Sequence, residues 1–424
     1  MRFKRKSIYI LLLVLLLSLP AYYQSTGESF YIKGKYIVTV SHGVLTEGIV
    51  KIEDGKILEV GQNIEVPEGA RLLHVPNGWV LPGLIEAHTT LGTGDRSRQS
   101  ESDETSSPNT AHMQILDAIN PFNKNIKYAA QAGITSVMIT PGRSNVIGGQ
   151  TAVVKFRGKT VREMAVHSPA GVKFSLGEGP KMTYGRKGRL PTTRMGSAYV
   201  IRNAFIQAQE YSQKLKVFQE KKKKDTSAVP PPRNMNLEIL GNVLRGELTA
   251  FIECYRVDDI MTALRIIDEF KFKAVLVGCA EAYKVAEEIA KRKIPVIVSP
   301  IGVGPRRIET QNASQENAGL LAKNGIKVVI KSDDALGIGT IRELPLLASL
   351  SVRGGLDREL AIRAITLSAA EVLGVDDRIG SLEKGKDADL VIFDGDPFHY
   401  KSRVIYVLID GQTIFSQDLK SEGN

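Results

Sequence analysis

Eight short apolar runs alternate with helical stretches between residues 79 and 332, and this alternation constrains the fold most strongly. The runs are WVLPGLIEAH, SVMIT, AVVKF, GVKFSL, AFIEC, AVLVG, VIVSP and KVVIKS. Strands that alternate with helices are typical of βα units, whose strands form a parallel sheet. Eight strands close a (β/α)8 TIM-type barrel, in which catalytic residues lie at the C-terminal ends of the strands. We therefore predict an α/β chain with such a barrel over 82–376.

The stretches between the runs have the apolar spacing of amphipathic helices. We predict helices over 257–270, 281–293 and 358–373. The segment 193–246 is a long and mostly helical insertion after the fourth strand. A Lys/Pro-rich loop at about 213–233 interrupts this insertion.

Both ends of the chain differ from its middle. Residues 28–81 and 377–418 alternate short strand-like runs with Gly and Asp-Gly turns. This pattern predicts that the two ends together form one small β-sandwich domain beside the barrel.

The first 21 residues have the pattern of a secretory signal peptide. A basic start that includes Arg2 and Lys4 precedes an apolar run from Ile8 to Leu19, followed by Pro20 and Ala21. The run is shorter than the roughly 20 residues that span a bilayer. We expect a cleaved signal and an exported protein, periplasmic or extracellular, with an uncleaved membrane anchor as the alternative.

The basic charge of the chain is concentrated in two short segments. Of the net charge of +10, four positive charges belong to the signal segment and four to Lys221–Lys224. The remaining chain is nearly balanced, which argues against a nucleic-acid partner. Two cysteines, Cys254 and Cys279, are too few for a disulfide framework, and a single disulfide and two buried thiols both remain open.

The end of the first run carries a recognisable motif. The stretch PGLIEAHTT over 82–90 resembles the PGLIDAHTH stretch of the metal-dependent amidohydrolase superfamily, with Thr90 in place of the second His. Further similar stretches lie at 145–164, 171–196, 256–264 and 369–398, and the resemblance is closest to the imidazolonepropionase- and prolidase-like branch. It implies a hydrolase of C–N bonds in amides, cyclic amides or peptide-like compounds.

Several metal ligands of that superfamily are replaced in this chain. Strand five reads Glu253-Cys254-Tyr255 where the superfamily has His-x-His, and Gly278 stands at the ligand position of strand six. No histidine lies anywhere between residues 168 and 398, so a shift in alignment cannot restore these ligands. We therefore predict a degenerate metal site.

Four residues that could serve a site remain at the strand ends. The resemblance implies His88, Glu178 and Glu253 as metal ligands and Asp333 as the catalytic group that moves the proton. One imidazole with carboxylates could hold a single divalent ion, such as Zn or Mn, and a site without any metal is the alternative.

The resemblance and the replaced metal ligands lead to two candidate functions. The first is a C–N hydrolase that binds a small amide or amino-acid-like ligand, with Arg194, Tyr184, Tyr255 and Arg256 as candidate substrate-binding residues. The second is a non-catalytic pseudoenzyme that acts as a small-ligand binding protein or as a partner subunit. A homodimer, or a heterodimer with an active homologue, is the assembly that the resemblance implies.

Overall fold

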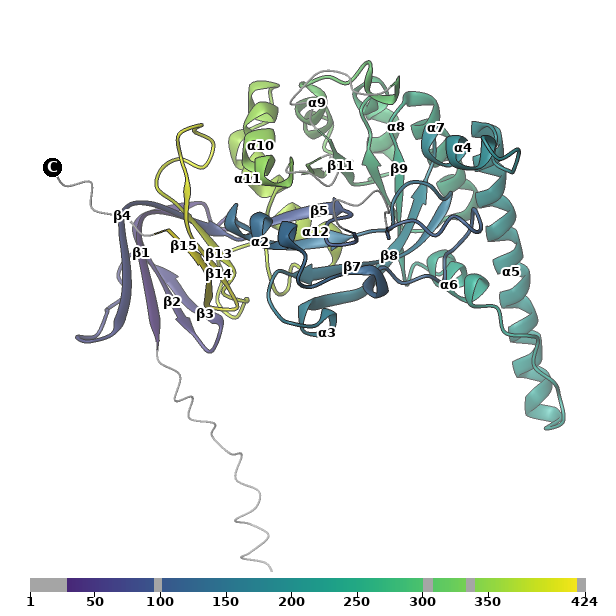
Figure 1. Cartoon of the computed structure of the whole chain (residues 1–424), viewed down its shortest axis with the longest axis horizontal. Helices are drawn as coiled ribbons and strands as arrows, with labels where there is room; N and C mark the ends of the chain where they lie inside the picture. The colour runs from purple at the N-terminus through teal and green to yellow at the C-terminus, as the bar shows by residue number, and fades with distance from the viewer. Residues whose placement is uncertain (1–28, 95–100, 300–307, 333–339, 418–424) are drawn as a thin grey trace, which may run out of the picture.

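The computed structural model describes residues 29–94, 101–299, 308–332 and 340–417, and the predicted signal peptide lies outside them. The described chain forms a nearly closed eight-stranded barrel surrounded by helices, and a separate seven-stranded sheet beside it (Figure 1). This architecture confirms the predicted fold class. In the described part of the chain, no helix is both long enough and apolar enough to cross a membrane.

The separate sheet combines the two ends of the chain, as predicted. Its strand order is β15-β14-β13-β4-β1-β2-β3. The strand β4 pairs in parallel with β1, and on its other side it pairs antiparallel with β13, where Pro82 lies opposite Leu390. The strands are β1 (Phe30–Val38), β2 (Val44–Glu53), β3 (Lys56–Gly61), β4 (Arg71–Pro82), β13 (Leu390–Phe393), β14 (Val404–Ile409) and β15 (Gln412–Ser416).

The barrel sheet takes one strand from each of the eight apolar runs. The order of its strands in the sheet, from β5 to β12, is the same as their order in the chain. They are β5 (Leu84–Thr89), β6 (Ile134–Ile139), β7 (Ile147–Lys155), β8 (Ala165–Ser175), β9 (Thr249–Cys254), β10 (Ala274–Gly278), β11 (Val296–Val298) and β12 (Val328–Ile330).

The strand β7 departs from the expected parallel arrangement. It pairs antiparallel with both β6 and β8, whereas the other neighbouring strands of the described sheet pair in parallel. A parallel neighbour needs a crossover of about a dozen residues or more. The linker 140–146 contains no helix, and 156–164 contains only the short α3 (Val161–Met164), so these connections make hairpins.

The helices follow the sequence pattern with some breaks. The helix α7 (Val257–Phe270) has the predicted bounds, whereas 281–293 forms a 3-10 turn and the short α8, and 358–373 divides into α11 and α12. The remaining bounds are η1 (Ile115–Ala118), α2 (Lys124–Gln131), α4 (Glu178–Gly185), α6 (Met235–Leu244), η2 (Ala282–Val285), α8 (Ala286–Lys291), η3 (Ile308–Thr310), α9 (Asn317–Lys323), η4 (Thr340–Glu343), α10 (Leu344–Arg353), α11 (Arg358–Ala364) and α12 (Leu367–Leu373).

The predicted insertion consists mainly of one long helix. The helix α5 (Arg194–Lys224) projects beyond the body of the barrel in Figure 1 and continues through the exposed residues Lys221–Lys224. The prediction of a loop from 213 was therefore wrong in its first half, because the non-helical part begins at Asp225. Lysine favours helix and suits a helix C-terminus, which explains why the helix includes this charged run.

Alternation along the strands separates two layers of the core. Phe251, Val275 and Val329 belong to one buried cluster inside the barrel, whereas their neighbours pack against the surrounding helices in another. The same alternation directs Glu253 and Lys331 inward, two positions beyond Phe251 and Val329. The inner layer is thus apolar at first and becomes charged toward the C-terminal ends of the strands.

One lysine connects the barrel to the separate sheet. Because β7 runs antiparallel, its last residue, Lys155, faces the sheet, and its Nζ lies 2.7 Å from Asp387, 3.0 Å from Asp389 and 2.5 Å from Asp410. Burial would lower the pKa of Lys155, but these aspartates raise it above its ordinary value. Burial raises the pKa of Asp389 to about 6 despite the lysine beside it.

Candidate functional site

Three charged or polar side chains meet inside the barrel at the C-terminal ends of its strands. His88 comes from β5, Lys173 from β8 and Glu253 from β9. The Lys173 Nζ donates a hydrogen bond of 2.8 Å to His88 Nε2 and forms an ion pair with Glu253, and His88 Nε2 lies 4.0 Å from Glu253 Oε2. We call these residues the barrel-centre cluster. Each of their side chains is at most 6% exposed.

The contacts of the barrel-centre cluster fix its charges. Burial, and then the positive charge of Lys173, hold the pKa of His88 well below its usual value, so the imidazole is neutral. Burial would raise the pKa of Glu253, but the Lys173 ammonium holds it below its usual range. Since an ammonium can only donate, the neutral His88 accepts at Nε2 and carries its proton on Nδ1.

A second buried carboxyl lies next to this cluster. Glu86 accepts hydrogen bonds from the backbone and side chain of Ser332, at 2.7 Å and 2.6 Å, and from the backbone of His88 at 3.1 Å. Burial raises the pKa of Glu86 to about 7, even though Ser332 and the charge of Lys331 oppose the shift. Glu86 can therefore gain or lose a proton near neutral pH.

Both ligand-type side chains of the barrel-centre cluster are bound to a lysine. The lone pair of His88 Nε2 is directed at Lys173, whose ammonium would repel a second cation. Within the described ranges, no group of three or more His, Cys, Asp or Glu is placed to hold a metal ion. Asp333, predicted as the catalytic group, lies outside the described residues.

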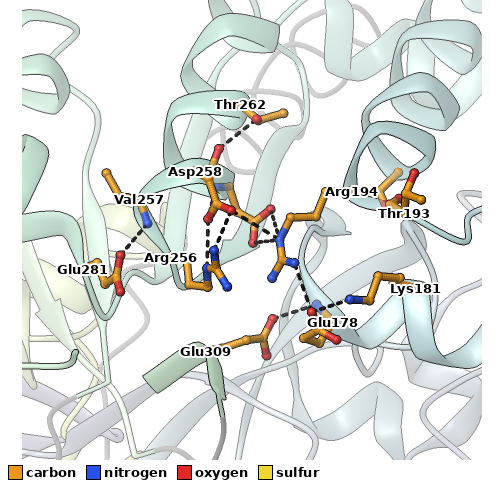
Figure 2. Close-up of polar contacts among 12 residues, drawn as sticks. Glu178, Lys181, Thr193, Arg194, Arg256, Val257, Asp258, Thr262, Glu281 and Glu309 are labelled. Atoms are coloured by element: carbon orange, nitrogen blue, oxygen red, sulfur yellow. Dashed lines mark hydrogen bonds and ion pairs between the residues drawn. The ribbon is translucent and has the colours of Figure 1, made fainter. Parts of the chain in front are cut away.

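Glu178 lies in a different group of contacts from His88 and Glu253. It begins α4, and its carboxylate binds Lys181 at 2.6 Å and Arg194 at 3.0 Å (Figure 2). Arg194 also donates from Nε to both carboxylate oxygens of Asp259, at 3.1 Å each. We call these four residues the Arg194 cluster. Burial would raise the pKa of Glu178, but Lys181 and then Arg194 lower it below its ordinary value.

The predicted substrate-binding arginines are both paired with acids at the start of α7. Arg194 binds Asp259, and Arg256 binds Asp258 through Nε at 3.1 Å and Nη2 at 3.0 Å (Figure 2). The structure thus brings Arg194, Arg256 and Glu178 into one neighbourhood, joined by carboxylates. Their pairing with these acids was not predicted from the sequence.

The two predicted tyrosines are buried. Tyr184 donates a 2.6 Å hydrogen bond to Asn145, and burial raises the pKa of its hydroxyl to about 12. Tyr255 is 2% exposed, and its ring fills the space beside Gly278, where a Cβ would lie 2.8 Å from the ring. Gly278 also has a φ of +87°, which favours glycine. The ring of Tyr255 therefore leaves no room for a side chain at position 278.

The cysteines are close together and reduced. Cys254 and Cys279 are free and buried, with their sulfur atoms 3.9 Å apart. The hydrogen bond with Cys279, together with burial, raises the pKa of Cys254 well above its ordinary value. A thiol with a raised pKa is a poor nucleophile, so we assign Cys254 no part in the site chemistry.

Sequence reasoning missed Lys173, Glu86 and Lys331, although a signal for each was present. All three are charged residues within or at the end of an apolar strand run, namely GVKFSL, WVLPGLIEAH and KVVIKS. A Lys or Glu inside such a run is almost never fully buried unless it is paired. That rule would have marked these positions as members of a buried polar site.

Comparison with known proteins places the chain among the amidohydrolases. The model of the amidohydrolase family matches residues 251–417. A crystal structure of an amidohydrolase from Thermotoga maritima MSB8 is 35% identical, with a TM-score of 0.86, and the match covers 92% of this chain and all of that one.

Two curated relatives are more distant in sequence. An imidazolonepropionase from Shewanella sp. (strain MR-4) is 24% identical over 84% of this chain and 89% of that protein. The amidohydrolase tasK from Hapsidospora irregularis is 25% identical over 87% of this chain, and the match spans 40% of its length. With a 35% identical relative matched over its entire length, the chain belongs to the amidohydrolase family.

Proposed function

We propose that this chain hydrolyses a C–N bond of a small amide or amino-acid-like compound at the C-terminal ends of its barrel strands. The observation that carries the proposal is the convergence of His88, Lys173 and Glu253 at those strand ends, with the buried carboxyl of Glu86 hydrogen-bonded to the backbone of His88. Catalytic residues of such barrels lie at this face. Membership of the amidohydrolase family supports the reaction class.

The buried groups supply acid–base chemistry suited to this reaction. Glu86 has a pKa of about 7, and a proton-transfer group works best when its pKa lies near the working pH. Burial lowers the pKa of Lys173 below its ordinary value, and the Glu253 carboxylate opposes this shift. The ammonium of Lys173 places a positive charge inside the barrel, where charge interactions are stronger than in water. A tetrahedral oxyanion formed from an amide would be stabilised by such a charge.

The substrate class follows from the charges around the strand ends. Arg194 and Arg256 lie near the end of β9, and their side chains are 25% and 35% exposed, respectively. A guanidinium can bind a carboxylate with two hydrogen bonds. We therefore expect N-acyl amino acids and dipeptides to bind better than neutral amides.

A second candidate function is ligand binding without turnover. It is favoured by the place of Lys173, which holds the lone pair of His88 and the carboxylate of Glu253. These two groups are then unavailable to a metal. Such a chain could act alone as a binding protein or as the inactive subunit beside an active homologue.

An assay of the full chain separates the two candidates. Dipeptides, N-acyl amino acids and cyclic amides would be incubated with the purified protein, and product amine or ring opening measured. We expect turnover of at least one class, lost in Asp333→Asn and retained in the matched control Asp334→Asn. Binding of these compounds by calorimetry, with no turnover of any class, would instead establish the binding protein.

We also propose that the protein is exported and self-associates. The basic and apolar pattern of residues 1–21 supports export. N-terminal sequencing of the protein from a secreting host should place the mature start near residue 22. Sedimentation of the mature protein should give a dimer, and a purely monomeric species would contradict that part of the proposal.

A further inference from the structure

We propose that Lys173 is the resident cation of this barrel, held by His88 and Glu253 in the position where these two ligand-type side chains would otherwise bind a divalent metal. The inference deepens the proposed function, on which it rests for the location of the site. The inference says that the positive charge at the site is a lysine ammonium and not a metal ion. Metal binding can test it without any measurement of turnover.

The first argument is the geometry of the two acceptors. His88 Nε2 and Glu253 Oε2 come from β5 and β9 and lie 4.0 Å apart. Lys173, on β8 between β9 and β7 in the sheet, reaches both atoms through one nitrogen. An imidazole and a carboxylate that converge on one point resemble a metal-binding pair, and here an amine nitrogen occupies that point.

The second argument is that these acceptors are already used. A metal binds an imidazole through a nitrogen lone pair, and the lone pair of His88 Nε2 accepts the hydrogen bond from Lys173. A metal at this nitrogen would require Lys173 to leave. The side chain of Lys173 is only 1% exposed, so leaving would move an ammonium through the packed barrel interior.

The third argument is the charge of the surroundings. A second lysine, Lys331, acts electrostatically on His88, Lys173 and Glu253. It follows β12, and its side chain is directed inward like that of Val329. Lys331 would repel a divalent ion more strongly than it repels the single charge of Lys173, and Glu253 and Asp103 both attract that single charge.

The test is the metal content and metal response of three full-length proteins. They are the unaltered protein, Lys173→Met and the control Lys181→Met, which removes a partly exposed lysine paired with Glu178 outside the barrel centre. Each is purified, incubated with zinc or manganese, desalted and assayed by elemental mass spectrometry. Its melting temperature is then measured with and without a chelator.

We expect less than one tenth of a metal ion per chain in the unaltered protein and in Lys181→Met, and no effect of the chelator on melting. In Lys173→Met, His88 and Glu253 are released, so zinc should bind and raise the melting temperature of this variant alone. A metal bound one to one in the unaltered protein and lost from Lys173→Met would overturn the inference, with or without turnover.

A measurement on the unaltered protein covers the case in which Lys173→Met does not fold. Nitrogen-15 NMR of the histidine rings should show His88 protonated on Nδ1, with a signal that is unchanged when zinc is added. A zinc-dependent shift of the Nε2 signal would show that the metal displaces Lys173 and would overturn the inference.

Discussion

Replacing Lys155 by Met should destabilise the protein strongly, because this residue holds together three carboxylates between the barrel and the separate sheet. Its side chain is 4% exposed, and those of Asp387 and Asp389 are 3% and 2% exposed. Asp387 keeps its ion pairs with Lys56 and Arg378, and Asp410 keeps its ion pair with Arg157, so the loss falls mainly on Asp389. Removing one partner of a buried ion pair costs about 3–5 kcal/mol when the charge left behind has no compensation. We expect a loss in this range near pH 7.5.

The loss should shrink in acid. The folded-state pKa of Asp389 is about 6, above its ordinary value of 3.8. Folding therefore takes up a proton between about pH 4 and pH 6, and the stability contributed by this group falls as the pH rises through that window. Lys155 lowers the pKa of Asp389, so without the lysine this pKa rises further, and protonation near pH 5 removes much of the unbalanced charge.

Urea denaturation of the unaltered protein, Lys155→Met and Lys159→Met at about pH 5 and about pH 7.5 tests this expectation. Lys159 is exposed, so its replacement should change the unfolding free energy by less than about 0.5 kcal/mol. A loss below about 1 kcal/mol in Lys155→Met, or a loss equal at both pH values, would refute the reasoning.

The Arg194 cluster and the cysteines give two further predictions. Arg194→Met should cost about 2 kcal/mol in urea denaturation because Asp259, only 3% exposed, loses its charged partner, whereas Arg256→Met, a more exposed pair, should cost less than about 1 kcal/mol. Equal losses would contradict the role assigned to burial. Cys254 and Cys279 are buried, so neither should react with a thiol reagent in the folded protein, and both should react in urea. A count of fewer than two reactive thiols per chain in urea would reveal a disulfide.

Local patterns in the sequence predicted most of the fold. Each apolar run became a strand of the barrel sheet, and α7 has the expected bounds because its apolar residues recur with helical spacing. The direction of β7 was not predicted, because an apolar run looks the same in either direction. Only the lengths of the linkers at 140–146 and 156–164 carried that information.

The candidate site was predicted in part. The motif at the end of β5 identified His88. Glu253 was predicted from its place at the end of β9, and its inward side chain lies beside His88. Pairing between distant strands cannot be read from either motif, so the lysine that joins these residues was missed. Glu178 was assigned by its position in a motif, and its partners Lys181 and Arg194 depend on how α4 and α5 pack.

The antiparallel strand β7 also bears on how the chain folds. The β6–β7 and β7–β8 pairs join residues that are close in sequence, such as Ile139 with Ala152, whereas β8 and β9 must close over the whole of α5 and α6. Closing a short loop costs less chain entropy than closing a long one, and local contacts form faster. The segment 134–175 should therefore acquire amide-exchange protection before the rest of the barrel, and it provides an edge onto which the later strands assemble.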